Sequence, residues 1–142
     1  MRRNLSFLSL ACLSLCLSVP VGLAGCGAQN AAEKQVRAAR VAASLSAQAL
    51  WQAYAENGKA ADRKFKGRVL RVTGQVANTG QTFAGNPFIM LRANDLGSGV
   101  QCFFTPEHKT QIDRLKQGQE VTIRGQCAGM PVAVELHGCL LQ

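Results

Sequence analysis

Cysteine and histidine are the side chains of this sequence best suited to catalysis or metal binding. Cys102, Cys127, Cys139 and His137 have the ligand types of a zinc site, but no two of these cysteines have C-x-x-C spacing. The other histidine, His108, belongs to no recognisable catalytic motif, and the sequence has no G-x-S-x-G, no H-E-x-x-H and no phosphate-binding glycine loop. We therefore expect no enzymatic activity, no metal and no cofactor.

The N-terminus has the pattern of an export signal. A positive start, Arg2-Arg3, precedes an apolar run over residues 5–20 that is short for a stable membrane span. The quartet Leu23-Ala24-Gly25-Cys26 resembles the lipobox of bacterial lipoproteins, in which cleavage precedes a cysteine whose thiol is lipidated. The resemblance predicts removal of residues 1–25 and acylation of Cys26. An ordinary secretory signal cleaved at the same place is the alternative.

The residues after Cys26 bear on where the protein resides. No stretch of twenty apolar residues follows it, so we expect the acyl chains to hold the protein at a membrane of the cell envelope. Gly27 stands where lipoproteins kept in the inner membrane have aspartate. In a Gram-negative cell this implies the outer membrane, with the protein facing the periplasm.

The chain is basic, with 16 lysine and arginine residues against 8 aspartate and glutamate residues and a net charge of +8. Removal of Arg2 and Arg3 leaves an excess of about six positive charges. Such an excess suits an anionic partner, such as nucleic acid or an acidic envelope polymer. It also suits a soluble small domain, and since the basic residues are spread thinly, both interpretations stay open.

Residues 28–57 contain no proline or glycine and are rich in alanine, glutamine, lysine and arginine, which favours a helix. The first part has few large apolar residues, so we predict residues 26–40 to be a lipidated tether. An apolar stripe from residue 41 predicts a helix docked on the domain and ending near Asn57-Gly58. The folded domain is then expected over residues 41–142.

Alternating apolar and polar residues predict a mainly β domain after Gly58. In the first strand Leu70, Val72 and Val76 share the inner face. Thr105-Pro106 begins a short helix, since threonine caps helices and proline suits their first turn. Five strands are expected, over residues 67–76, 87–91, 100–104, 120–125 and 132–141. A short helix between strands three and four gives the order of a five-stranded OB-fold barrel.

Several segments are similar to the bacterial tRNA_anti-like OB-fold domains. They are Val72-Thr73-Gly74-Gln75-Val76, Val100-Gln101-Cys102-Phe103-Phe104, Val121-Thr122-Ile123-Arg124-Gly125-Gln126-Cys127 and Leu136-His137-Gly138-Cys139. The resemblance covers residues 46–142 and departs from the family at Gly58-Lys59 and in the polar segment 78–86. It implies a fold related to the anticodon-binding domain of tRNA synthetases, and no established activity. Members of this family include lipoproteins, which agrees with the N-terminal pattern.

Outside the cytoplasm the three remaining thiols can form one disulfide and leave one thiol over. The barrel order places strands three and five side by side and parallel, which brings Cys102 and Cys139 to one rim and Cys127 to the other. Bridged cysteines need Cα atoms within about 7 Å, so we favour Cys102–Cys139. The family resemblance leaves Cys127–Cys139 as the alternative.

OB-fold barrels bind oligonucleotides or oligosaccharides on strands two and three. On this chain the corresponding surface is expected to include Arg71, Phe83, Arg92, Phe103 and Arg124. Aromatic side chains beside arginine are typical of single-strand binding, yet only 6% of the residues are aromatic. The sequence thus favours a lipid-anchored, non-catalytic binding module for an envelope protein or polymer. A lipoprotein that binds single-stranded nucleic acid is the alternative.

Overall fold

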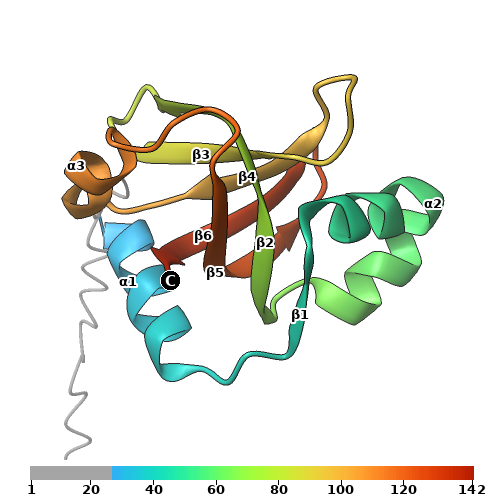
Figure 1. Ribbon diagram of the computed structural model, residues 1–142. Helices are drawn as coiled ribbons and strands as arrows, with labels where there is room; N and C mark the ends of the chain where they lie inside the picture. The colour runs from blue at the N-terminus through green and yellow to red at the C-terminus, as the bar shows by residue number, and fades with distance from the viewer. Residues whose placement is uncertain (1–26) are drawn as a thin grey trace, which may run out of the picture.

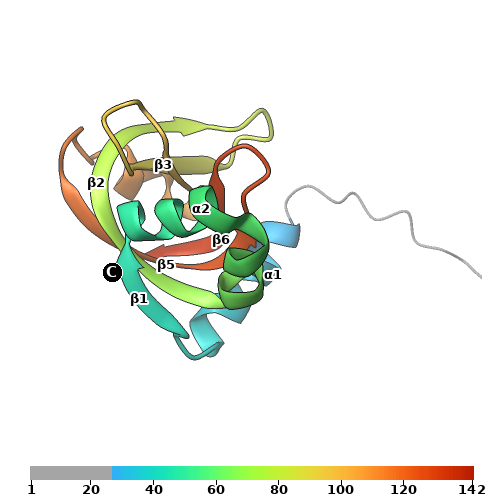
Figure 2. The same ribbon diagram turned by 90° about the vertical axis from the view of Figure 1, so that its right-hand side faces the viewer.

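The computed structural model describes residues 27–142, in which five strands close into a mixed barrel (Figures 1 and 2). Neighbouring strands follow the order β2-β3-β4-β6-β5, and β2 pairs with β5 to complete the ring. Only β4 and β6 run parallel within this ring. The five strands are β2 (Val69–Gln81), β3 (Pro87–Arg92), β4 (Gly99–Phe103), β5 (Glu120–Gly129) and β6 (Val134–Leu141).

A short helical segment, η1 (Pro106–His108) followed by α3 (Lys109–Ile112), connects β4 to β5. The predicted order of three strands, a helix and two strands is therefore confirmed, as is the parallel pairing of the third and fifth barrel strands. The alternation predicted for the first strand also holds, because Leu70, Val72 and Val76 are buried while Arg71 is exposed. The barrel interior is filled by aliphatic side chains from all five strands, including Ile89, Leu91, Val100, Ile123 and Leu136.

The predicted polar loop over residues 78–86 is shorter in the structure. Strand β2 continues to Gln81 and pairs with β3 as a hairpin, after an irregularity between Val76 and Asn78. Its second half pairs with β3 and its first half with β5, so the strand bends around the barrel. None of the helices within residues 27–142 is long and apolar enough to cross a bilayer.

A sixth strand, β1 (Ala43–Ser46), was not expected from the sequence. It pairs in parallel with β2 outside the barrel ring (Figure 2). Helix α2 (Ala47–Phe65) follows directly, because the Ser46 hydroxyl accepts a hydrogen bond from the Ala49 amide at 3.1 Å and caps the helix. Our prediction of one continuous helix from residue 41 is therefore wrong at its start.

Helix α2 covers one end of the barrel with Leu50, Tyr54 and Phe65. The predicted end of this helix at Asn57-Gly58 is a kink instead. Asn57 has non-helical torsion angles, and its side-chain oxygen accepts the Ala60 amide at 3.0 Å, so it caps the second half of the helix.

Helix α1 (Gly27–Ala38) occupies the segment that we predicted to be a loosely packed tether. Its one large apolar residue, Val36, is fully buried against Val69 and Leu140 on the outside of the barrel. The helix backbone also lies directly on β6 at Gly138, where an added Cβ would come within 2.4 Å of the Ala32 carbonyl carbon. The expectation that this segment is too poor in large apolar residues to pack firmly does not hold, because a glycine in a distant strand admits the helix backbone.

Candidate binding surfaces

Three half-buried rings lie side by side on the outer face of β3, β4 and β6. Phe88 pairs across the strands with Phe103, with ring centroids 6.3 Å apart. Phe103 lies against the imidazole of His137, with centroids 4.9 Å apart and planes inclined by 33°. We call Phe88, Phe103 and His137 the aromatic row. It is a partly exposed platform of the kind on which flat ligand rings stack.

Strand alternation decides which aromatic side chains reach this face. Phe103 and Phe104 are adjacent, and the sequence left open which of them faces the core. Phe104 is fully buried, so Phe103 points outward. The ring of Phe88 lies over Gly80 of the neighbouring strand, where an added Cβ would be 2.7 Å from its Cζ.

Polar groups surround His137 at one end of the row. Its Nε2 lies 3.1 Å from Glu135 Oε2, and its Nδ1 lies 3.3 Å from the side-chain amide nitrogen of Gln29 at the start of α1. Within residues 27–142 no lysine or arginine lies over a ring of the row. The polar side chains in contact with His137 are therefore an amide and a carboxylate.

The predicted arginines Arg71 and Arg124 lie together on a different wall of the barrel. They are directly opposite each other on β2 and β5. Arg124 donates a hydrogen bond to the carbonyl of Ala39, just after the end of α1, whereas Gln29 near the start of α1 contacts the aromatic row. These two points of the helix are about 15 Å apart. The structure therefore does not place Arg71 or Arg124 beside Phe103, and the two surfaces lie at opposite ends of α1.

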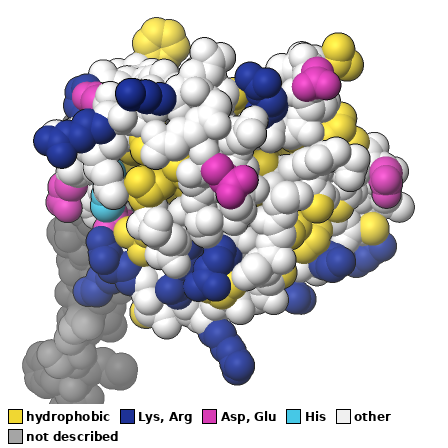
Figure 3. Space-filling model, viewed as in Figure 1, with side chains coloured by type: hydrophobic (Ala, Val, Ile, Leu, Met, Phe, Trp, Pro, Cys, Tyr) yellow, Lys and Arg dark blue, Asp and Glu magenta, His cyan; other side chains and the backbone are white. Residues whose placement is uncertain are grey.

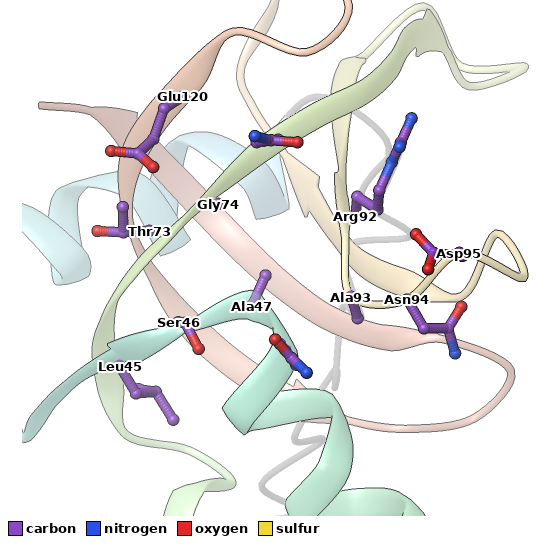
Figure 4. A pocket seen from close by; sticks show the side chains of 12 residues that line it. Leu45, Ser46, Ala47, Thr73, Gly74, Arg92, Ala93, Asn94, Asp95 and Glu120 are labelled. Carbon is purple, nitrogen blue, oxygen red and sulfur yellow. The ribbon is translucent and has the colours of Figure 1, made fainter.

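Phe83 and Arg92 lie at two further places. Phe83 is fully exposed in the β2–β3 connection. Arg92, at the end of β3, lines an open groove of about 690 Å³ (Figure 4). Glu120 and Thr73 line one side of this groove, and Arg92 and Asp95 line the other. The groove has both signs of charge and contains none of the other predicted site residues.

The three described cysteines are buried, free thiols. Cys102 and Cys127 both lie opposite Leu136, on either side of β6, so our placement of Cys127 at the other rim is wrong. The pKa of Cys139 is well above its ordinary value, mainly because of burial and then because of the nearby Cys102 thiol. Those two thiols are therefore neighbours in the core. The Cys102–Cys139 disulfide remains a prediction.

Cys127 has a separate environment. Its sulfur lies 3.4 Å from the hydroxyl of Tyr54 on α2. Burial, followed by the contact with this thiol, raises the pKa of Tyr54, and burial raises the pKa of Cys127. Within residues 27–142 no three side chains of the metal-binding types are grouped closely enough to hold an ion.

A buried carboxylate on α1 was missed by the sequence analysis. Glu33 accepts hydrogen bonds from the Thr105 hydroxyl at 2.7 Å and from Arg37 at 2.7 Å, and it lies 3.2 Å from Nε2 of His108. Burial by itself would raise the pKa of Glu33, but these hydrogen bonds outweigh it and leave the pKa below its ordinary value. The Glu33 carboxylate thus connects α1 to Thr105 and His108, in the segment that follows β4. A single acidic residue in an otherwise neutral or basic segment was the available signal.

Comparison with known proteins gives a family and a fold. A family model described as tRNA_anti-like matches residues 1–139. No curated protein matches the sequence. A solved structure from Klebsiella pneumoniae, described as a "putative nucleic acid-binding lipoprotein", is similar with a TM-score of 0.57 and 17% identity, over 77% of this chain and 96% of that one. Asparaginyl-tRNA synthetase from Pyrococcus horikoshii gives a TM-score of 0.45 and 21% identity, over 55% of this chain and 19% of the enzyme.

Proposed function

This chain belongs to the tRNA_anti-like family, and we propose that it is an envelope lipoprotein whose OB barrel binds a ligand without catalysing a reaction. The observation that carries the proposal is the aromatic row of Phe88, Phe103 and His137. Phe88 and Phe103 lie on the second and third barrel strands, where OB-folds bind oligonucleotides and oligosaccharides, and His137 lies beside them on the fifth. Its neighbours offer hydrogen bonds and include no grouping of nucleophile and base.

The proposed ligand is an envelope polymer or protein, and the surroundings of the row favour a neutral sugar polymer. A sugar ring can place its apolar face on Phe103 while its hydroxyl groups reach Glu135 and Gln29. A phosphodiester chain in the same position would meet the carboxylate of Glu135 and no cation over the rings. The carboxylate beside the row therefore favours a neutral ligand over an anionic one.

Attachment to a membrane is the second part of the proposal. The lipobox-like quartet ends at Cys26, directly before the first residue of α1. The similar Klebsiella structure is described as a lipoprotein, which supports the same mode of attachment for this chain. The Cys26→Ser variant is expected to take up no radiolabelled palmitate and to leave the membrane fraction. Equal palmitate labelling of the variant would contradict lipidation at this residue.

Single-stranded nucleic acid is the alternative ligand. The similar Klebsiella protein is described as nucleic acid-binding, and the basic charge of this chain, about +6 without Arg2 and Arg3, also favours nucleic acid. Phe103 and the pair Arg71 and Arg124 lie on surfaces at opposite ends of α1. A nucleic-acid strand that contacts both surfaces would therefore have to be extended.

The two ligands can be separated by one titration series. Fluorescence anisotropy would follow a labelled oligomer of N-acetylglucosamine and a labelled single-stranded oligonucleotide at low and near-physiological salt. We expect the Phe103→Ala variant to weaken saccharide binding by about tenfold, which corresponds to about 1.4 kcal/mol. The Phe83→Ala variant, which loses an exposed ring elsewhere, is the matched control and is expected to bind normally.

The oligonucleotide arm decides the alternative. Under the proposal, its binding disappears near physiological salt and does not depend on Phe103. Tight binding that survives this salt and falls in the Phe103→Ala variant would replace the saccharide with nucleic acid. Absence of binding to both probes would leave an envelope protein, to be captured by cross-linking in cells.

A further inference from the structure

Three arginines lie around the end of α1 that is farthest from Cys26. Arg40 follows Ala39, whose carbonyl accepts a hydrogen bond from Arg124, and Arg71 lies directly across the strands from Arg124. Arg40 and Arg71 are exposed. We call Arg40, Arg71 and Arg124 the arginine corner. In Figure 3, lysine and arginine side chains gather on the lower part of the face where α1, β2 and β5 meet in Figure 1.

The corner has no acidic counterpart in the described part of the chain. The ion pairs within residues 27–142 involve other cations, namely Arg37, Lys66, Lys109 and the two histidines. In addition, Nε of Arg124 is buried without a hydrogen-bond partner. Like charges directly opposite each other on paired strands are destabilising. A surface that keeps such a pair without a carboxylate is suited to an external anion.

The position of the corner relative to the lipid identifies that anion. Cys26 precedes α1 directly, and α1 is fixed to the barrel by Val36, Glu33 and Gly138. The twelve residues of α1 span about 18 Å, so the corner lies at that distance from the first residue of the helix. No flexible tether intervenes between this residue and the barrel. A lipidated Cys26 therefore leaves the corner within about 18 Å of the anchor, within reach of the headgroups of the bilayer.

The exposed side of α1 between these two points has mixed charge. Lys34 and Arg37 lie there, but Glu107 lines the same shallow groove. Glu33, the only acidic residue of α1, is buried. The net positive charge on this side of the molecule is thus concentrated at the corner.

We propose that the arginine corner binds the anionic headgroups of the bilayer that holds the acyl chains, so that the domain is attached at both ends of α1. This inference rests on the lipidation of Cys26 in the proposed function. An acyl anchor and a basic surface together are the usual combination for firm attachment. Two contacts 18 Å apart also fix the orientation of the barrel, which a single lipid attachment would leave free to rotate.

Trypsin provides a test on the full lipidated protein. The connection between α1 and β1 has no helix or strand and contains the exposed Arg40, so it is a site for cleavage. The protein would be reconstituted in neutral phosphatidylcholine vesicles and in vesicles with about 30% phosphatidylglycerol. We expect cleavage after Arg40 to be at least about fivefold slower on the anionic vesicles, and the difference to disappear at high salt.

On the anionic vesicles, cleavage after Arg40 is expected to be about fivefold faster in the Arg71→Ala variant than in the unaltered protein. One basic residue near a membrane surface contributes about 1 kcal/mol of binding free energy, which corresponds to this factor. The Arg92→Ala variant removes an exposed arginine outside the corner and is the matched control, with protection unchanged. Cleavage at Arg114, which is exposed after α3, serves as the internal reference for the amount of trypsin activity.

The outcomes separate the two proposals. Equal cleavage after Arg40 on both kinds of vesicle, with the protein still floating with neutral vesicles, overturns the inference and leaves the lipid anchor intact. Failure to float with neutral vesicles contradicts the anchor itself. Protection by added single-stranded oligonucleotide, with none from anionic lipid, would assign the corner to nucleic acid and also overturn the inference.

Discussion

Replacing Gly138 with alanine is expected to detach α1 from the barrel. Gly138 has a φ of 61°, and a Cβ at this position would lie 2.4 Å from the carbonyl carbon of Ala32 and 2.5 Å from the amide nitrogen of Glu33. Both atoms belong to the helix backbone, so neither can move aside alone. The whole helix must shift away from β6, because real Cβ atoms do not make contacts this short.

The cost can be worked out from the contacts that the shift removes. Left-handed backbone costs an alanine about 1–2 kcal/mol. Exposure of Val36 costs about 1.5–3 kcal/mol, and loss of the hydrogen bond between Thr105 and the Glu33 carboxylate costs about 1.5–3 kcal/mol. We therefore expect a decrease of about 4 kcal/mol or more in the free energy of unfolding, limited by the energy with which α1 is docked.

The Gly118→Ala variant is the matched control. Gly118 has a φ of 81°, but a Cβ there would meet no atom within 4 Å, so only the backbone cost of about 1–2 kcal/mol applies. Urea unfolding followed by Trp51 fluorescence would give both values, and hydrogen exchange would report loss of protection in α1 for the Gly138 variant alone. Equal destabilisation of the two variants, with α1 amides still protected, would refute the close docking of α1 on β6.

Two other predictions concern titratable groups. The folded-state pKa of Glu33 is lowered, so the stability that its carboxylate contributes is complete above the unfolded-state pKa of about 4.3 and is lost as the pH falls through the lower folded-state value. Glu33→Gln is therefore expected to lower the free energy of unfolding by about 1.5–3 kcal/mol at neutral pH. In urea titrations the difference from the unaltered protein should shrink below about pH 4. A difference that persists to the most acidic pH measured would contradict the role of the charge. Protein isolated from an oxidising compartment is expected to show one reactive thiol after denaturation, Cys127, if Cys102 and Cys139 pair as we predict. Reduction of that disulfide should then lower stability by about 4 kcal/mol. Release of three thiols before any reductant is added would exclude the disulfide.

The strand pattern was readable from the sequence because it depends on neighbours two residues apart. Leu70, Val72 and Val76 face the core as that alternation requires, and the short helix begins after Thr105 as predicted. The Thr105 side chain, however, makes no capping hydrogen bond and donates to Glu33 instead. The same is true of the order of the barrel strands, since short connections leave few ways to arrange five strands. The lipobox-like quartet before Gly27 is likewise a local pattern, and lipidation at Cys26 stays a prediction from it.

The candidate site was only partly predictable because it joins residues that are far apart in the chain. Phe103 was identified, but its neighbours in the aromatic row come from β3 and β6, and the alternation between Phe103 and Phe104 was settled only by the strand register. Arg71 and Arg124 were expected beside it. Strand pairing puts them opposite each other, and they lie at the other end of α1 from the row.

Composition alone misjudged α1, because its packing depends on residues about one hundred positions away. A segment with one large apolar residue does not by itself bury enough surface to dock. It docks here because Gly138 lets the backbones approach and because Thr105 satisfies the carboxylate of Glu33. The sequence by itself determined the barrel, the pattern for export and the basic charge. The tertiary structure decided which side chains share a surface, because that depends on long-range contacts that no local pattern records.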